Sequence, residues 1–415
     1  MSENDRAHNF LLAHGFEKLD FVALSKNMLS DMRNGLCGKK ADEDMILTHI
    51  DPTEICVCEK SVIVLDAGGT NFRSCVVSFD STGKATISDF EKTAMPGTSG
   101  ALSKSAFFSK IAENVFRLRG RANEICFCFS YPMRIEDDGD GVLLGFSKEI
   151  NAPEVVGSKI GFELKNTLVQ NGWDKSLRVH LLNDTVSALL FGSSRGKYVS
   201  YIGFILGTGM NCAYVQQAGE FCQKKQIVVC ESGKFSALPC SLFDEMLDAK
   251  SAKPGSSLIE KQCAGAYLSS LALIIIKTAA DEGLFSKENC EKITKIKSLD
   301  LKTVSDFLES KSAEFFDIEG EDDRSILFSL FDSVVDRSAR ICAAIIGAAL
   351  EQCGSSSEKN PVCVSCNGTT FFKTYKIASR TKKYLSELLS SQQIYFKILD
   401  EEADITIGTA MVAFR

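Results

Sequence analysis

The feature that most constrains the fold is a strand–turn–strand unit in the segment Ser61–Asp80, SVIVLDAGGTNFRSCVVSFD. Two apolar runs, Val62–Leu65 and Cys75–Phe79, flank Asp-Ala-Gly-Gly-Thr-Asn, which is typical of a β-hairpin whose turn holds more than two residues. Gly68 and Gly69 lack a Cβ atom, so they can adopt a positive φ and point backbone N–H groups at anionic oxygens. Turns select the same residues for structural reasons alone, so this pattern by itself leaves both interpretations open.

Two further turns of this kind occur later in the chain. Gly207-Thr208-Gly209 lies between predicted strands at Tyr201–Leu206 and Asn211–Gln216, and Asn367-Gly368-Thr369 follows a predicted strand at Val362–Ser365. The three turns match neither the P-loop, whose glycines lie in one segment, nor the single fingerprint of dinucleotide-binding domains. Turns on separate segments can instead contact a nucleotide from both sides of a cleft.

The length and charge of the chain narrow the class of protein. A length of 415 residues exceeds what one hydrophobic core usually serves, so we expect two domains of about 150 to 250 residues with a cleft between them. The net charge of −7 argues against a nucleic-acid partner. The opening MSENDRAHN is unlike a signal peptide, and the longest apolar runs, Leu271–Ile276 and Ile341–Leu350, are too short to span a bilayer. We therefore expect a soluble, cytoplasmic protein with no membrane partner.

The sixteen cysteines lie mostly within strand-like runs such as EICVCEK and ICFCFSY, where a thiol serves as a small core hydrophobe. This usage fits a reducing cytosol. Only Cys363 and Cys366 have Cys-x-x-Cys spacing, and the chain has only four histidines. A zinc site is therefore not expected.

Apolar residues at helical spacing predict helices between the strands, and this alternation favours the α/β class. The segment His8–Arg33 predicts an amphipathic helix interrupted at His14-Gly15, and a helix is expected to open at Asn183-Asp184-Thr185 after a strand at Leu177–Leu182. Further helices are predicted at Ser103–Leu118, Val155–Gln170, Leu258–Ala280, Ser325–Leu350 and Thr406–Phe414.

Seven ordered segments resemble one known family. They are VIVLDAGGTNFRSCVV, FCFSYP, GFSKEINAPEVVG, LLNDTVSALLFG, IGFILGTGMNCAYV, PGSSLIEKQCAGAYLSSL and CNGTTFFK. In this order they resemble the hexokinase family of the actin-like ATPase superfamily, from about Met28 to the C-terminus. The resemblance implies a two-domain actin-like ATPase (ribonuclease H-like) α/β fold with a central cleft. Residues 59–186 plus 404–415 would form the small domain, and residues 1–58 plus 187–403 the large one.

The resemblance also implies an activity: phosphorylation of the 6-hydroxyl of glucose or a related hexose, with ATP and Mg²⁺, giving hexose 6-phosphate and ADP. Asp184 would be the general base that takes the proton of the hydroxyl. Taken alone, Asp184 could instead cap its helix. Lys148 would neutralise phosphate charge or bind sugar oxygens, or, taken alone, would be an ordinary surface lysine. Closure of the cleft would exclude water.

The resemblance assigns the remaining site residues by matching positions. Without it, Glu260 would be expected to face solvent, and Asn211 to serve its turn. The implied sugar-binding residues are Ser130, Ser147, Lys148, Asn183, Asp184, Asn211, Glu231 and Glu260. The implied nucleotide-binding residues are Asp66, Gly68, Gly69, Thr70, Asn71, Arg73, Gly207, Thr208, Gly209, Gly368 and Thr369, with Asp66 holding Mg²⁺ largely through water.

This chain departs from the family pattern mainly at the sugar-facing segments. It has Phe146-Ser147-Lys148 where the family often has Trp-Thr-Lys, and Val229-Cys230-Glu231-Ser232-Gly233 in place of Asn-Thr-Glu-Trp-Gly. The family's Met-Leu-Pro-Thr motif is replaced by Met45-Ile46-Leu47-Thr48, and its Asp-Gly-Ser motif by Asn367-Gly368-Thr369. Two alternatives therefore stay open: a non-catalytic sugar sensor of the same fold, and a kinase for an N-acetylated or otherwise modified sugar. The sequence predicts neither the sugar preference nor the oligomeric state.

Overall fold

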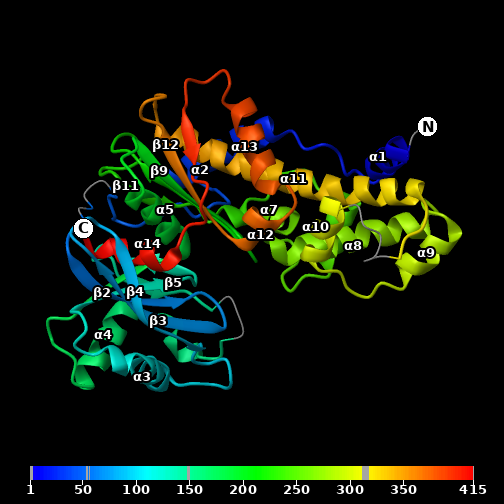
Figure 1. Ribbon diagram of the computed structural model, residues 1–415. Coiled ribbons are helices and arrows are strands. Elements are labelled where there is room, and N and C mark those ends of the chain that lie inside the picture. The colour runs from blue at the N-terminus through cyan, green and yellow to red at the C-terminus, as the bar shows by residue number, and fades with distance from the viewer. Residues whose placement is uncertain (1–2, 53–54, 56, 147–149, 311–316, 415) are drawn as a thin grey trace.

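The computed structural model describes residues 3–52, 55, 57–146, 150–310 and 317–414. Within these residues, two mixed β-sheets carry the fold, with helices packed on both (Figure 1). The chain thus has the α/β architecture that the alternating pattern predicts.

The first sheet has five strands in the described part of the chain. β2 and β3 form the predicted hairpin, with Asp66 opposite Arg73 at its turn end, and β5 and β8 extend the sheet in parallel. The spatial order is β4 (Ala85–Ala94), β3 (Asn71–Phe79), β2 (Lys60–Ala67), β5 (Glu124–Phe129) and β8 (Arg178–Leu182). A separate small hairpin joins β6 (Met133–Ile135) to β7 (Gly141–Leu143).

The second sheet contains the second predicted hairpin, formed by β9 and β10, with Leu206 opposite Met210 at its turn. β12 lies parallel to β9, which brings Asn367 next to Ile205 at the same end of the sheet. Over the described residues the order is β1 (Ile46–Leu47), β11 (Gln226–Val229), β10 (Met210–Gln216), β9 (Ser200–Leu206), β12 (Val362–Asn367) and β13 (Phe396–Ile398).

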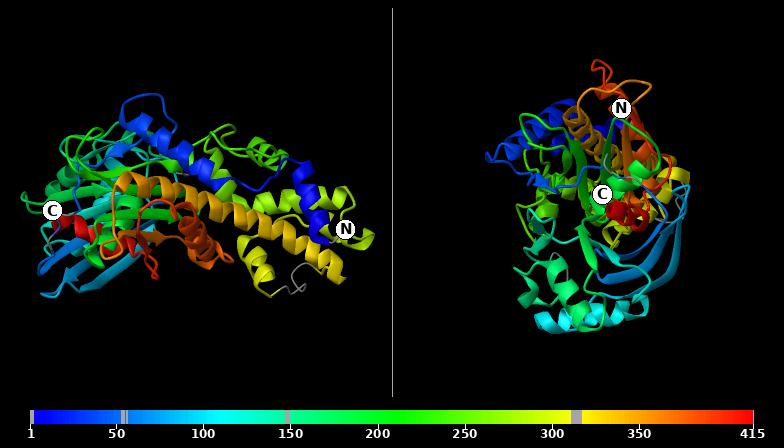
Figure 2. Two further views of the ribbon diagram at one scale, coloured as in Figure 1. Left: turned by 90° about the horizontal axis from the view of Figure 1, so that it is seen from above. Right: turned by 90° about the vertical axis from the view of Figure 1, so that its left-hand side faces the viewer.

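Helices surround each sheet and separate the two. Figures 1 and 2 show the 33-residue helix α11 running along the part of the molecule that contains the second sheet, with α1, α2 and α13 beside it. The helices are α1 (Glu3–Ala13), α2 (Phe21–Leu36), α3 (Lys104–Val115), α4 (Ile160–Gln170), α5 (Asp184–Ser194), α6 (Leu242–Ala249), α7 (Leu258–Cys263), α8 (Gly265–Asp281), α9 (Lys287–Thr294), α10 (Leu301–Ser310), α11 (Glu321–Cys353), α12 (Thr369–Lys373), α13 (Ile377–Leu388) and α14 (Ile405–Met411). Short 3₁₀ turns cover Phe116–Leu118, Pro153–Val155, Ser232–Lys234 and Val412–Phe414.

The prediction of one helix over Leu258–Ala280 is wrong, because α7 ends at Cys263 and α8 begins at Gly265. Ala264 between them has an extended backbone, with φ −86° and ψ 152°. The interruption lets the Gly265 N–H donate to Gly207 O at 2.9 Å, and a Cβ atom at Gly265 would lie 2.7 Å from that oxygen. Contact with the second glycine turn therefore outweighs continuous helix formation here.

Helix α5 lies between the two sheets and is held at very short range from two sides. A Cβ atom on Gly203 of β9 would lie 2.3 Å from Thr185 O, and one on Gly408 of α14 would lie 1.9 Å from Ser187 O. Ser187 Oγ and Thr409 Oγ1 form a hydrogen bond of 2.9 Å across the same contact. Only glycine permits such close backbone approach, so these two positions set how closely α5 packs against β9 and α14.

The described residues form three hydrophobic cores. One of them surrounds α5 and contains residues of both sheets and of α14. The other two cores lie under α3 and α4 beside the first sheet, and around α11 beside the second. The exact domain boundaries stay a prediction. Within the described residues, no helix is both long enough and apolar enough to cross a membrane.

We predict that Gly408→Ala lowers the stability of the protein markedly. The new methyl group would overlap Ser187 O, and overpacking of this kind typically costs about 1–3 kcal/mol. Thermal unfolding followed by circular dichroism would measure the change in midpoint. Gly145→Ala is the matched control, because its Cβ would meet nothing within 4 Å and its φ is not left-handed. Equal midpoints for the two variants would contradict the proposed role of Gly408.

Candidate active site

The turn of the β2–β3 hairpin carries an ion pair at its base. Asp66 on β2 and Arg73 on β3 are cross-strand neighbours, and Arg73 Nη1 donates to Asp66 Oδ2 at 2.6 Å. The Asp66 side chain is 15% exposed, whereas that of Arg73 is 41% exposed and accessible to a ligand. Gly68 does not adopt a positive φ, so that expectation is wrong for this residue. Gly68 and Gly69 instead line a cavity, and a Cβ atom at Gly68 would lie 3.5 Å from Ser130 Oγ.

That cavity brings together predicted residues from three parts of the chain, and we name it the turn cavity. The first turn contributes one wall, and Ser130 at the end of β5 and Asp184 at the start of α5 contribute another. Asp184 N donates to Ser130 Oγ at 3.2 Å, and the Tyr131 hydroxyl donates to Gly69 O at 2.8 Å. The cavity is lined by Asp66, Gly68, Gly69, Asn71, Arg73, Ser130, Asp184, Asn367 and Ile405.

Asp184 is the first residue of α5, and its neighbour Asn183 is the helix cap. Asn183 Oδ1 accepts the N–H of Val186 at 2.9 Å, which is the hydrogen bond that an N-cap makes. The alternative role of Asp184 as the cap is therefore wrong. Its carboxylate instead lies at the positive end of the helix dipole, where a negative charge is stabilised.

Three predicted sugar ligands, Asn211, Glu231 and Glu260, are held by hydrogen bonds near the start of β10. Asn211 Nδ2 donates to Glu231 Oε1 at 2.8 Å, and Met210 N donates to Glu260 Oε2 at 3.0 Å. Glu231 has a left-handed backbone, with φ 57° and ψ 42°, which is strained for a residue other than glycine. Gly209 and Gly233 both pack against Glu260, since a Cβ atom on them would lie 2.8 and 3.2 Å from Glu260 Oε2.

Burial raises the pKa of both glutamates. For Glu231, the nearby Lys234 ammonium and the hydrogen bond from Asn211 oppose the increase, whereas Asp44 and Asp184 add to it. For Glu260, the hydrogen bond from Met210 N and the charge of Lys261 oppose the increase. Perturbed carboxylate pKa values of this kind cluster at functional sites.

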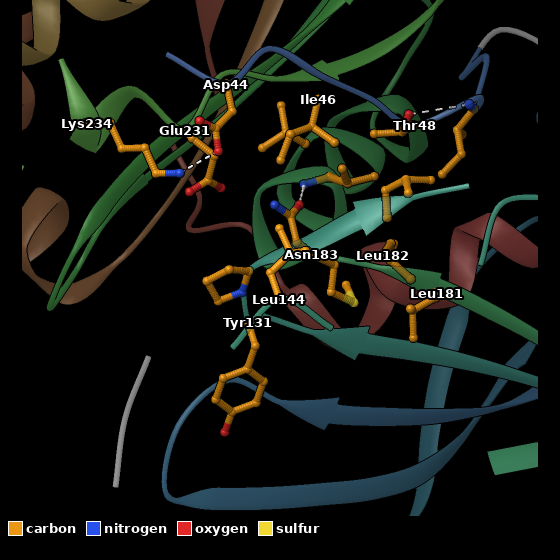
Figure 3. A pocket seen from close by; sticks show the side chains of 16 residues that line it. Asp44, Ile46, Thr48, Tyr131, Leu144, Leu181, Leu182, Asn183, Glu231 and Lys234 are labelled. Carbon is orange, nitrogen blue, oxygen red and sulfur yellow. Dashed lines mark hydrogen bonds and ion pairs between the residues drawn. The ribbon is translucent and has the colours of Figure 1, made fainter. Parts of the chain in front are cut away.

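A second cavity lies beside the turn cavity, and we name it the side cavity (Figure 3). Its polar residues include Asn183 and Glu231, so it adjoins the predicted sugar ligands. One wall is apolar and comes from both sheets and the β6–β7 hairpin. The lining residues are Asp44, Ile46, Thr48, Ile50, Tyr131, Pro132, Met133, Ile135, Leu144, Leu181, Leu182, Asn183, Val186, Val229, Glu231 and Lys234. Ser147 and Lys148, the other two predicted sugar residues, lie outside the described residues.

A third cavity contains the second glycine turn, and we name it the outer cavity. Gly207 and Thr208 line it together with Thr369, and Thr370 Oγ1 donates to Gly207 O at 2.9 Å. Gly368 has φ 123°, and a Cβ atom there would lie 2.1 Å from Leu206 O. Gly209 closes the turn, its carbonyl accepting from Gly207 N at 2.9 Å.

Several residues in or next to these cavities carry no signal in the sequence and were not predicted. Helix α10 contributes Leu301, Lys302, Ser305 and Asp306 to the outer cavity, and Glu402 accepts the Gly368 N–H at 3.0 Å. An amphipathic helix of this composition carries no motif, because charged and hydroxyl side chains are normal on a solvated face. Tyr131 lies in the segment FCFSYP, but its hydrogen bond to Gly69 O and its place in the wall of the side cavity depend on tertiary structure.

The donor chemistry fits a nucleotide with a hydrated Mg²⁺. No group of three or more His, Cys, Asp or Glu side chains that could hold a metal occurs among the described residues. Mg²⁺ commonly keeps several waters and is held by one or two carboxylates plus substrate phosphates. Asp66 beside the glycine-lined turn cavity matches that mode, and Arg73 and Asn71 supply donors for phosphate oxygens.

The chain matches two profiles that are both described as hexokinase, over residues 7–194 and 201–415. Hexokinase-5 of Oryza sativa subsp. japonica is 28% identical, over 94% of this chain and 85% of that protein. Hexokinase-1 of Schizosaccharomyces pombe is 26% identical, over 94% and 86% of the two chains.

Solved structures agree on the fold. Hexokinase from Schistosoma mansoni, in a complex with glucose, superposes with a TM-score of 0.79 at 21% identity over the whole of both chains. The described sheets and helices therefore form the two-domain fold of that enzyme class. This chain belongs to the hexokinase family, whose members are phosphotransferases that transfer a phosphoryl group from ATP to a hexose hydroxyl.

Proposed function

We propose that this protein phosphorylates the 6-hydroxyl of glucose or a related hexose, using ATP and Mg²⁺, and releases hexose 6-phosphate and ADP. One observation carries the assignment of the base. Asp184 lines the turn cavity opposite the glycine turn. Asn183, and not Asp184, caps helix α5, so the carboxylate of Asp184 is not needed for capping. A carboxylate at that position can take the proton of a hydroxyl as it attacks the γ-phosphate.

The nucleotide would be held between the two hairpins. On one side, Asn71, Arg73 and the backbone of the first turn face the phosphates, with Thr70 exposed at its tip. On the other, Thr208 and Thr369 line the outer cavity, in which the adenosine would lie. Mg²⁺, when bound, neutralises phosphate charge, and Asp66 would hold it through water. Most of the catalysis would then come from positioning and electrostatic stabilisation.

The sugar would be held by amides and carboxylates. Asn183, Asn211, Glu231 and Glu260 can both donate to and accept from a ring of hydroxyls, which suits a hexose. The glucose complex of the Schistosoma mansoni enzyme supports a hexose as the ligand. Ser130, Ser147 and Lys148 complete the proposed set.

We also infer a cytoplasmic location. Most cysteines in the described part of the chain are free thiols, and many of these are buried, such as Cys212, Cys263 and Cys342. Free thiols persist in reducing compartments, whereas oxidising compartments favour disulfides.

A panel of sugars tests the activity itself. We expect MgATP and glucose to give ADP in a coupled assay, with mannose, fructose and N-acetylglucosamine as comparison acceptors. The pattern of rates would reveal the sugar preference. If no sugar stimulated ADP release while glucose still raised the melting temperature, the protein would be a sugar sensor and the proposed activity would be wrong.

We predict that Asp184→Asn lowers kcat by at least about 10²-fold, because general base catalysis typically contributes 10²–10⁴-fold. Glucose binding, measured by calorimetry, should change much less, because the amide keeps the size and an acceptor of the side chain. The exposed Asp174→Asn is a control for loss of a carboxylate elsewhere. Full turnover in Asp184→Asn would rule out this residue as the base.

The raised pKa values predict a pH dependence of sugar binding. Glu231 and Glu260 should take up protons at a higher pH than exposed glutamates do, and a protonated carboxyl loses acceptor capacity for sugar hydroxyls. The KM for glucose should therefore rise as the pH falls from about 8 to about 5. In Glu231→Gln, which cannot titrate at that position, this rise should be smaller. A KM that is constant with pH in the unmodified protein would contradict the prediction.

A further inference from the structure

The side cavity holds an ion pair that the mechanism above does not use. Lys234 Nζ donates to Asp44 Oδ2, and both residues line the side cavity together with Glu231 (Figure 3). Their side chains are 45% and 42% exposed, so neither is needed for the hydrophobic core. An ion pair this exposed contributes little to stability, and it lies beside a proposed sugar ligand.

The backbone brings Lys234 and Glu231 onto one tight turn. Glu231 has a left-handed conformation, and the following 3₁₀ turn returns Lys234 N to Glu231 O at 3.0 Å. The turn brings the backbones of the two residues together, and both side chains line the side cavity. Any movement of the turn would move both charges together.

The segment of residues 42–48 brings Asp44 to the same place from the other side. Asp42 Oδ2 accepts from Ser236 N at 2.9 Å, just after the turn, and Met45 N donates to Cys230 O at 3.4 Å, just before it. The segment is itself fixed by Asp31, whose carboxylate accepts from Asp42 N and Glu43 N at 3.0 and 2.9 Å. Asp44 is thus held across from Glu231 by contacts on both sides of it.

Four groups from four elements influence the charge of the Glu231 carboxylate. Lys234 comes from the 3₁₀ turn, Asp44 from the segment of residues 42–48, Asp184 from the start of α5, and the amide of Asn211 from β10. Lys234 supplies the positive charge among them, while Asp44 and Asp184 are both acidic. The electrostatic potential at the Glu231 carboxylate therefore depends on the balance between the positive charge of Lys234 and the negative charge of Asp44.

We propose that Lys234 and Asp44 are positioning residues that set the charge of Glu231 for sugar binding. Lys234 holds the carboxylate in its ionised, hydrogen-bond-accepting form, and Asp44 keeps the ammonium in place while reducing its effect. This inference rests on the proposed function only in that Glu231 is taken to bind the sugar.

If the pair sets the charge of Glu231, removing either partner should shift the pH dependence of glucose binding in opposite directions. A purely structural bridge makes no such prediction. In Lys234→Met the negative charge of Asp44 is no longer compensated. The pH below which glucose binding weakens, which we call the low-pH limb, should therefore rise by roughly half a unit. Asp44→Asn leaves the ammonium unopposed, so the same limb should move to lower pH by a similar amount. A structural bridge, broken in either variant, would shift both in one direction.

The experiment is calorimetric titration of the whole protein with glucose at a series of pH values. It is run on the two single variants, the double variant Asp44→Asn/Lys234→Met and the exposed control Lys224→Met. We expect opposite shifts in the single variants and a profile close to that of the unmodified protein in the double and control variants. Shifts in the same direction, or no shift in either single variant, would overturn the inference.

Glu231→Gln separates failure of this inference from failure of the proposed function. If that variant binds glucose as tightly as the unmodified protein, Glu231 is not a sugar ligand, and the proposed sugar site is wrong. If it binds glucose weakly while the two single variants shift together, the sugar site stands and the role of the Lys234–Asp44 pair is refuted.

Discussion

The close packing of α5 is the contact on which the rest of the site depends. This helix touches β9 at Gly203 and α14 at Gly408, at distances that leave no room for a Cβ atom. Its first residue is Asp184, so the position of the proposed base is set by backbone contacts to two other elements. The Asn183 cap then satisfies an N–H at the helix start without using the carboxylate. The proposed base is in this way placed by groups that would take no part in the reaction.

The charges in the site are organised around that helix in two different ways. Asp66 is paired directly with the exposed Arg73, which keeps an anion and a cation together beside the place proposed for phosphate. Glu231 and Glu260 are held by hydrogen bonds from Asn211 and Met210 N, and burial raises their pKa values. The charge of Asp66 is thus compensated at the proposed phosphate site, whereas the charge of the carboxylates at the proposed sugar site depends on their surroundings.

Much of the fold was predictable from the sequence, because strand ends and glycine turns are local signals. Both hairpins, and the helix that opens after Leu182, follow from apolar runs that stop at small polar residues. The break at Ala264 was not predictable, because it depends on a hydrogen bond to Gly207 far away in the sequence. The same holds for Gly203 and Gly408, whose importance comes from close approach rather than from positive φ. The contribution of α10 was missed because its residues reach the outer cavity only through tertiary packing.

The contact between α5 and α14 also has a consequence for the order in which the molecule assembles. Ser187 and Thr409 are 222 residues apart, whereas the two strands of the first hairpin are joined by a short turn. Contacts at such separation carry a large loop-closure entropy and tend to form late. The first sheet can therefore take shape before α5 has both of its glycine contacts. The first glycine turn, which we propose contacts the nucleotide, would then form before Asp184 reaches its final position. Catalytic competence would be among the last properties that the chain acquires.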